Sequence, residues 1–280
     1  MLNEEKKHII QNAIKNDADC GSALEDTFSL EEMLFYVRHL QMSGGRVGKE
    51  TVQKVVKLAR RYSPWYILTI GDEGIPYVEN GKGYVFTDWG TGVQAKKIFS
   101  SMGYELGLAK VDAYDELPFD MFARYGVQTT SINKGASGIA LKTDFLAKTN
   151  SAENVILNNA LLNFAIAAKT GSHLVTELDR TVSGLILKSE LYFVSEGEWW
   201  SPMQEIIEFS EGGSAIGGYL FSDRKEATLI YLNQISTLRK APARKIFGAD
   251  PLIGKYVLNP GSISLLISQS TVDAVVKKQI

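Results

Sequence analysis

Cysteine and histidine, two side chains that commonly hold metals, are scarce in this chain of 280 residues. Cys20 is the single cysteine, so neither an internal disulfide nor a cluster of thiolate ligands can form. No two of the three histidines, His8, His39 and His173, lie at the helical spacing typical of a metal site. The sequence therefore predicts no metal site and no cofactor, and it fits a reducing compartment.

An excess of charge of one sign is also missing. The 30 Lys and Arg residues nearly balance the 32 Asp and Glu residues, so the chain lacks the broad positive field of a nucleic-acid-binding protein. The most apolar stretch, residues 155–168, contains three asparagines and is too short to cross a bilayer. The first residues, "MLNEEKKHIIQ", do not resemble a signal peptide. We therefore expect no nucleic-acid or membrane partner and a cytoplasmic location.

The chain contains partial matches to a phosphate-binding loop and to a nucleophile elbow, but neither motif is complete. "SGGRVGKET" at residues 43–51 has Ser43 where a phosphate loop needs glycine, and Glu50 where it needs Ser or Thr. "GGSAIGG" at residues 212–218 lacks the glycine that must follow the serine of a nucleophile elbow by two positions. We read the first as a turn between helices and the second as a flexible hairpin connection. The sequence leaves the question of enzymatic activity open and favours a non-catalytic protein.

A repeated hexamer is the most distinctive feature that is present. "GYVFTD" occupies residues 83–88 and "GYLFSD" occupies residues 218–223. Two flanking blocks also recur in the same order, a strand-like block rich in aromatic and β-branched residues and a block with an Asn-x-Gly turn signal. These blocks are "PWYILTI" and "ELYFVSE" before the hexamers, and "INKGASGIAL" and "LNPGSISLLI" after them.

The distances between matching residues indicate an internal duplication. Tyr66 and Tyr192 are 126 positions apart, Phe86 and Phe221 are 135 apart, and Asn133 and Asn259 are again 126 apart. The second copy thus has nine extra residues before its hexamer and nine fewer after it. Length changes of this kind are expected in surface connections.

Hydrophobic periodicity predicts the same order of elements in both copies, with helices first and then strands. The expected helices are 29–41, 49–62, 93–102 and 116–126 in the first copy, and 151–169, 175–188 and 224–232 in the second. We therefore predict a mixed α/β fold of two similar domains, each a mixed β-sheet covered by helices. The domains would span residues 25–149 and 150–280, after a helical arm at residues 1–24.

The chain resembles the SseB family, named for enhanced serine sensitivity. The resemblance rests on the "N-x-x-L" helix at residues 154–162, the strand at 189–194, the aromatic entry to a helix at 219–223 and the "NPG" at 259–261. It covers residues 151–275 and is fainter in the first copy, where Lys134 replaces the proline. The resemblance implies tandem domains of a cytoplasmic bacterial α/β protein, with no catalytic residues to assign.

Asp88 and Asp223, which end the two hexamers, have two possible roles. Each can cap the helix that follows it, with Glu226 in capping-box spacing after Asp223, and with Thr91 as an alternative helix start in the first copy. Alternatively, both line a cleft between the repeats together with the tyrosines of the hexamers, as the site of an enzyme or small-ligand sensor. That alternative site consists of Tyr84, Asp88, Tyr219 and Asp223. The capping role is favoured because it explains why the aspartate recurs.

Two neighbouring features of the second copy are candidates for binding another protein. Adjacent tryptophans on a strand point to opposite faces, so one of Trp199 and Trp200 needs a second surface to cover it, either the partner repeat, which is favoured, or another protein. The run "RKAPARK" contributes four cations, Arg239, Lys240, Arg244 and Lys245, which suit an acidic partner or a solvated loop. From these residues we predict a non-catalytic binding or regulatory protein that engages a protein partner, with a small-molecule ligand possible.

Overall fold

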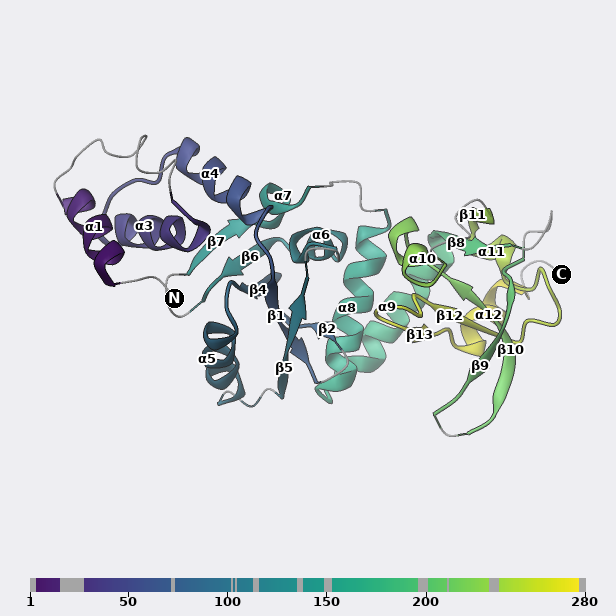
Figure 1. The fold of residues 1–280 in the computed structure, drawn as a ribbon. Helices are drawn as coiled ribbons and strands as arrows, with labels where there is room; N and C mark the ends of the chain where they lie inside the picture. The colour runs from purple at the N-terminus through teal and green to yellow at the C-terminus, as the bar shows by residue number, and fades with distance from the viewer. Residues whose placement is uncertain are drawn as a thin grey trace. The chain divides into compact units, whose positions relative to one another are not determined.

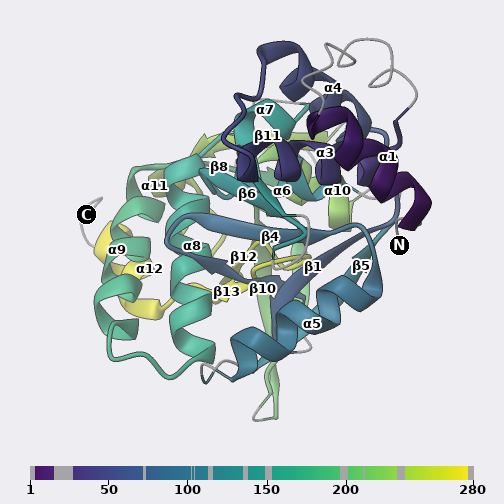
Figure 2. The same cartoon turned by 90° about the vertical axis from the view of Figure 1, so that its left-hand side faces the viewer.

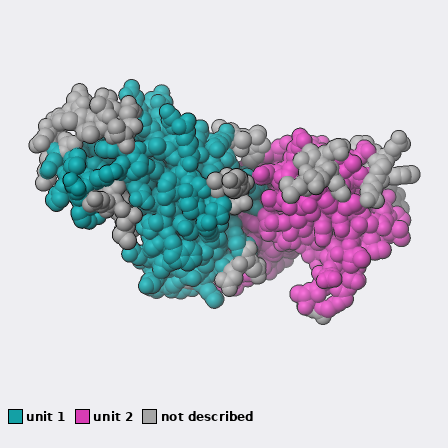
Figure 3. Space-filling model, viewed as in Figure 1, with its two compact units in different colours: residues 1–151 teal, residues 152–280 magenta. Residues whose placement is uncertain are grey.

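The chain divides into two compact units, residues 1–151 and 152–280 (Figure 3). Each unit contains β-strands with helices packed against them. The computed structural model describes residues 4–15, 28–71, 74–101, 103, 105–112, 116–134, 138–148, 153–195, 201–210, 212–231 and 237–276. Their strands and helices alternate along the chain, which confirms the predicted mixed α/β class. Unit 1 includes the N-terminal segment that the sequence sets apart as a helical arm.

Unit 1 is a seven-stranded mixed sheet (Figure 1). Its strands follow the path β5-β1-β4-β6-β7, with β2 paired to β1 and β3 paired to β4. The strands are β1 (Trp65–Ile70), β2 (Ile75–Pro76), β3 (Val78–Glu79), β4 (Lys82–Phe86), β5 (Leu106–Val111), β6 (Thr129–Ile132) and β7 (Ile139–Lys142). The helices are α1 (Glu4–Lys15), α3 (Leu30–Met42), α4 (Lys49–Ala59), α5 (Trp89–Ser100), α6 (Pro118–Arg124) and α7 (Thr143–Leu146).

Unit 2 begins with two long helices that pack side by side, α8 (Val155–Lys169) and α9 (Val175–Lys188) (Figures 1 and 2). Its strands are β8 (Glu190–Val194), β9 (Gln204–Glu208), β10 (Ser214–Leu220), β11 (Leu238–Pro242), β12 (Lys255–Leu258) and β13 (Leu265–Leu266). The shorter helices are α10 (Arg224–Ile230), α11 (Ala243–Ile246) and α12 (Gln269–Val276). A single antiparallel bridge joins the pair β11-β8 to the sheet β13-β12-β10-β9.

The two units share one strand order and one set of strand directions. β11-β8-β10-β12-β13 in unit 2 matches β5-β1-β4-β6-β7 in unit 1, and in both the third and fourth strands are the parallel pair. The register also matches at the second strand of this order, which is β1 in unit 1 and β8 in unit 2. Its pairs are Tyr66 with Lys110 and Phe86 in unit 1, and Tyr192 with Lys240 and Phe221 in unit 2. This agreement supports the predicted duplication, which remains a prediction.

The first and fourth letters of the hexamer serve packing in both units. A Cβ on Gly83 would lie 2.5 Å from the Phe122 ring, and a Cβ on Gly218 would lie 2.9 Å from Pro202, so neither position has room for a side chain. The phenylalanines, Phe86 and Phe221, are fully buried. The recurring glycine and phenylalanine are therefore requirements of close packing.

A buried asparagine joins the parallel strand pair in each unit. Asn259 has a positive φ, and its amide both accepts a hydrogen bond from the Ser222 N–H and donates one to Ser222 Oγ, each at 2.9 Å. Asn133 makes the same two bonds to Thr87, also at 2.9 Å. The fifth letter of the hexamer thus supplies a hydroxyl that the asparagine binds. We call each such pair an asparagine joint.

Asp88 and Asp223 cap the helices that follow them, which confirms the capping role. Asp88 accepts from the Thr91 N–H at 2.8 Å, and Asp223 accepts from the Glu226 N–H at 3.0 Å. Thr91 is therefore not the start of the helix, and α5 begins at Trp89 rather than at Val93 as predicted. The Glu226 carboxylate, in capping-box spacing after Asp223, accepts from the Ser262 hydroxyl.

The nine extra residues of the second copy lengthen one hairpin. Val78 pairs with Gly83 in unit 1 as Gln204 pairs with Gly218 in unit 2, so the two hairpins start in the same register. The unit 1 hairpin then closes at Asn80 and Gly81, whereas β9 and β10 continue and extend away from the rest of unit 2 (Figure 1). The predicted flexible connection at 212–218 is correct only at Gly212 and Gly213, because β10 begins at Ser214.

Replacing Asn259 with alanine should lower the free energy of unfolding by about 3 kcal/mol, because the buried Ser222 N–H loses its acceptor and alanine disfavours a positive φ. Urea unfolding of the full chain measures the loss, and hydrogen exchange at the Ser222 amide assigns it to unit 2. Asn259→Gly relieves the backbone and should recover only part of the loss. Asn163→Ala, at an exposed position of α8, is the control and should change stability by less than about 0.5 kcal/mol. Equal losses of unfolding free energy in Asn163→Ala and Asn259→Ala would show that the asparagine joint does not stabilise unit 2.

Shortening the hairpin tests the register. Replacing residues 206–216 with Asn-Gly joins Glu205 to Gly217 by the turn that unit 1 uses, in which both central residues have positive φ. Unit 2 should still fold, with a loss of about 2–3 kcal/mol from removing the buried Ile207. Replacing residues 206–215 instead shifts the register by one residue and should prevent folding. Circular dichroism and urea unfolding compare the two, and similar stability would refute the proposed equivalence.

Candidate functional site

Helix α4 has an apolar stripe that is only partly covered. Thr51, Val55 and Ala59 are buried at helical spacing and form its inner face. Val52 and Val56 lie one position further round the helix and are half-buried. Val52, Val55, Val56 and Ala59 stand at i, i+3, i+4 and i+7, the pattern of one apolar stripe, and Val52 and Val56 are the part of it that is only half covered. We call this half-covered part the second side of α4.

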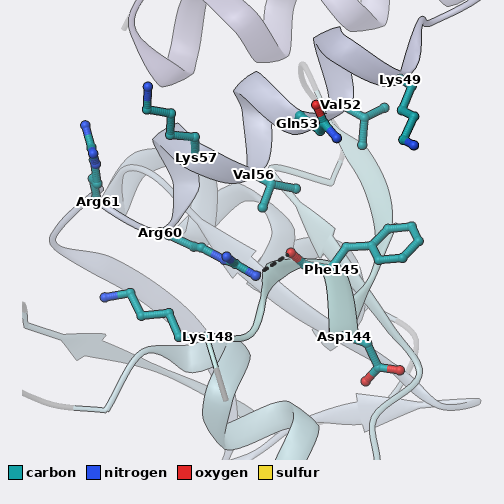
Figure 4. A pocket seen from close by; sticks show the side chains of 10 residues that line it. All are labelled: Lys49, Val52, Gln53, Val56, Lys57, Arg60, Arg61, Asp144, Phe145 and Lys148. Carbon is teal, nitrogen blue, oxygen red and sulfur yellow. Dashed lines mark hydrogen bonds between the residues drawn. The ribbon is translucent and has the colours of Figure 1, made fainter. Parts of the chain in front are cut away.

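A pocket of about 800 Å³ lies over this second side, between α4 and α7 (Figure 4). Its lining is Lys49, Val52, Gln53, Val56, Lys57, Arg60 and Arg61 from α4 and the residues just after it, together with Asp144, Phe145 and Lys148 from α7 and the residues just after it. The Phe145 ring is 55% exposed, although phenylalanine is normally a core residue. The pocket thus has an apolar floor and a polar rim.

Arg60 holds the two walls of the pocket together. Its Nε donates to the carbonyl of Leu146 at 3.0 Å, and its Nη2 donates to the carbonyls of Phe145 at 3.0 Å and Ala147 at 2.5 Å. These carbonyls belong to the end of α7, where the last carbonyl groups of a short helix need partners. A cation also interacts favourably with a helix C-terminus. Arg60 is therefore a structural clamp.

The remaining cations of the pocket are available to a ligand. Among the residues that the structure describes, the side chains of Lys49, Lys57, Arg61 and Lys148 make no ion pair. Lys57, Arg61 and Lys148 lie towards one end of the pocket, and Lys49 lies at the other end near Phe145 (Figure 4). Among the described residues that line the pocket, Asp144 is the only one with a carboxylate. The pocket is therefore locally basic in a chain whose net charge is −2.

A second pocket, of about 680 Å³, lies on the sheet of unit 2. Its lining is Ile207, Glu208, Phe209, Ser210, Tyr219, Val257, Pro260, Ser264 and Leu266. Glu208 is the one charged side chain of this lining, so few groups there select or orient a ligand. The pocket of unit 1 combines apolar area with charge and is the better candidate.

The structure describes only some of the residues predicted to bind a protein partner. Trp199 and Trp200 lie outside the described residues. Arg239 and Lys240 lie on β11, and Arg244 and Lys245 lie on α11, so the basic run is a strand and a short helix rather than a loop.

Lys240 has partners within unit 2. It pairs with Glu153 and lies 5.1 Å from the centre of the Tyr192 ring. The hydrogen bond from Lys240 lowers the pKa of the Glu153 carboxyl. Arg244 and Lys245 are exposed on α11.

The tyrosines of the predicted cleft have roles within their own units. The Tyr84 side chain is only 2% exposed, its hydroxyl donates to Glu79 at 3.1 Å, and burial raises its pKa. Tyr219 is half-buried on β10, with its ring 6.5 Å from that of Tyr231. Asp88 and Asp223 cap helices, as described above. Each of these four residues thus contributes to the packing or capping of its own unit.

The pocket of unit 1 was not predicted from the sequence. Helical periodicity correctly places α4, but Phe145 and Lys148 reach it from more than 80 positions along the chain. One signal was present in α4 itself. Val52 and Val56 lie at the edge of the apolar stripe of α4, where basic residues adjoin it.

Within the ranges that the structure describes, side chains of His, Cys, Asp and Glu nowhere gather in threes around a position suited to one metal ion. Of the helices in the same ranges, none combines the length and apolar character needed to cross a lipid bilayer.

Comparison with protein-family models, with curated protein sequences and with solved structures gave no match for this chain. Functional evidence therefore comes from the geometry of the units themselves.

Replacing Arg60 with methionine should destabilise unit 1 by about 2 kcal/mol, because three carbonyls at the end of α7 lose a charged donor while the methionine keeps the apolar stem. Urea unfolding measures the loss, and hydrogen exchange at the Ala147 amide reports on α7. Arg61→Met is the matched control, since Arg61 makes no such bond among the described residues, and should cost less than about 0.5 kcal/mol. Similar losses in both variants would show that Arg60 is not a clamp.

Proposed function

We propose that the protein is a non-catalytic binding or regulatory protein that engages another protein through the basic pocket on α4 and α7. One observation carries this proposal: four cations without ion-pair partners among the described residues surround an apolar floor that includes an exposed phenylalanine. Protein-binding surfaces commonly combine apolar anchors with a charged rim. An acidic partner with apolar side chains complements both parts of the pocket.

The rival function, an enzyme or small-ligand sensor between the repeats, has less support. It assigns Asp88 and Asp223 to a catalytic or ligand-binding cleft, whereas both carboxylates accept hydrogen bonds from the first turns of helices. A carboxylate held by backbone amides in this way is a structural cap.

The family and location belong to the same proposal. A cytoplasmic, bacterial protein with tandem SseB-like domains agrees with the strand order that the two units share. The asparagine joint at equivalent positions of both units adds support for an internal duplication. Arg244 and Lys245, exposed on α11, remain candidates for a second contact with the partner.

A photo-crosslinking amino acid at position 53, an exposed position of the pocket, tests the proposed function in cell extract. We expect a covalent adduct with a protein that, once purified, binds the wild-type chain at least about tenfold more tightly than the variant Lys57→Glu/Arg61→Glu, because the reversed charges repel an acidic surface. Isothermal calorimetry measures both affinities.

Lys96→Glu/Lys97→Glu on α5 reverses the same number of charges away from the pocket and is the control. It should leave the affinity within about twofold. Equal weakening by the two double variants, or no adduct at position 53, would overturn the assignment of the pocket as the binding site.

A further inference from the structure

We propose that the basic pocket on α4 and α7 receives one acidic amphipathic helix of the partner, laid antiparallel to α4 with its acidic first turn near Lys57, Arg61 and Lys148. This inference rests on the proposed function and specifies the chemistry of the partner.

The shape of the pocket fits a helix. The residues from α4 and its end recur at helical spacing from Lys49 to Arg61, so the floor follows the helix axis for about 18 Å. A docked helix of about twelve residues has that length. Helices that bind in grooves place apolar residues at every third or fourth position, which matches Val52, Val56 and Phe145 as contacts.

Unit 2 contains a helix at the corresponding position. Its helix α9 precedes β8, as α4 precedes the matching strand β1 in unit 1. Helix α12 follows the last strand of unit 2 and packs against α9. Thr271 of α12 donates to Ser183 of α9 at 3.1 Å. Ser183 directly follows the buried Val182, as Val56 follows the buried Val55. The side of α9 that corresponds to the pocket floor therefore holds a helix.

Unit 1 has only a short segment at this place. The chain after β7 forms α7, which has four residues, whereas α12 has eight. Val272 and Val275 of α12 are buried, so in unit 2 the chain supplies its own apolar cover. In unit 1 the pocket lies over Val52 and Val56, beside the four-residue α7. A partner helix would therefore complete unit 1 as α12 completes unit 2.

The charges set the direction of the partner helix. Three cations lie at the end of the pocket where α4 ends, and that end of α4 also carries the negative end of its helix dipole. An antiparallel helix brings its positive N-terminal end there, and acidic residues are most stable in the first turn of a helix. The apolar residues of the later turns then reach Val52 and Phe145. An anionic membrane surface would use the same cations without this direction, so vesicles serve as the competing probe.

A phage-displayed library of 16-residue helical peptides tests this inference with the full-length chain as bait. Four positions in the first turn, four in the last turn and three at i, i+3 and i+7 are randomised. We expect Asp and Glu to be enriched at least about fivefold in the first turn relative to the last, with Leu, Ile or Phe at the spaced positions. Selection on Lys57→Glu/Arg61→Glu should abolish the acidic preference, and selection on Lys96→Glu/Lys97→Glu should preserve it.

The outcomes separate this inference from the proposed function. Acidic residues enriched equally in both turns, or mainly in the last, would overturn the antiparallel direction. Enrichment without apolar spacing, or binding of the full chain to phosphatidylglycerol vesicles in preference to every selected peptide, would overturn the helix. If either occurs while the adduct at position 53 keeps its dependence on Lys57 and Arg61, the proposed function stands and the helical partner fails. If both experiments are insensitive to those cations, both proposals fail.

Discussion

The asparagine joint is the contact on which the fold of each unit depends. It lies where the third strand of the sheet ends and a helix begins, and it ties that point to the end of the neighbouring parallel strand. Parallel strands are joined by long connections, so a side chain that bonds both N–H and hydroxyl of the opposite strand end fixes their relative position. With this point fixed, the aspartate that follows opens the helix.

Local chemistry made most of the fold predictable. The hexamer, the turn-forming asparagines and the two aspartates act on neighbours in the chain or on the adjacent strand, so their roles follow from residue type and spacing. The start of α5 was less predictable. Gly90 and Gly92 weaken the helical pattern there, and the structure overrides this because Asp88 caps the helix and Gly92 leaves room for Leu108.

The candidate site was beyond prediction because it depends on tertiary contacts. The apolar residues of α4 indicate a second surface, but nothing in the sequence places Phe145 beside them. That proximity comes from the pairing of β7 with β6 and from the bonds of Arg60 to the end of α7. The sequence suggested the basic run on β11 and α11 instead, where Lys240 turns out to pair with Glu153.

The near neutrality of the whole chain limits what the basic pocket can do at a distance. At physiological ionic strength charges are screened over about 8 Å, so four cations in one pocket do not attract a partner from far away. In the proposed complex, burial of apolar area on Val52, Val56 and Phe145 would then supply most of the affinity. The cations would act at close range, where they would reject partners of the wrong charge and set the orientation of the right one. The two units share one strand order and differ in the segment that packs on the helix before β1 or β8, which is the eight-residue α12 in unit 2 and the four-residue α7 in unit 1.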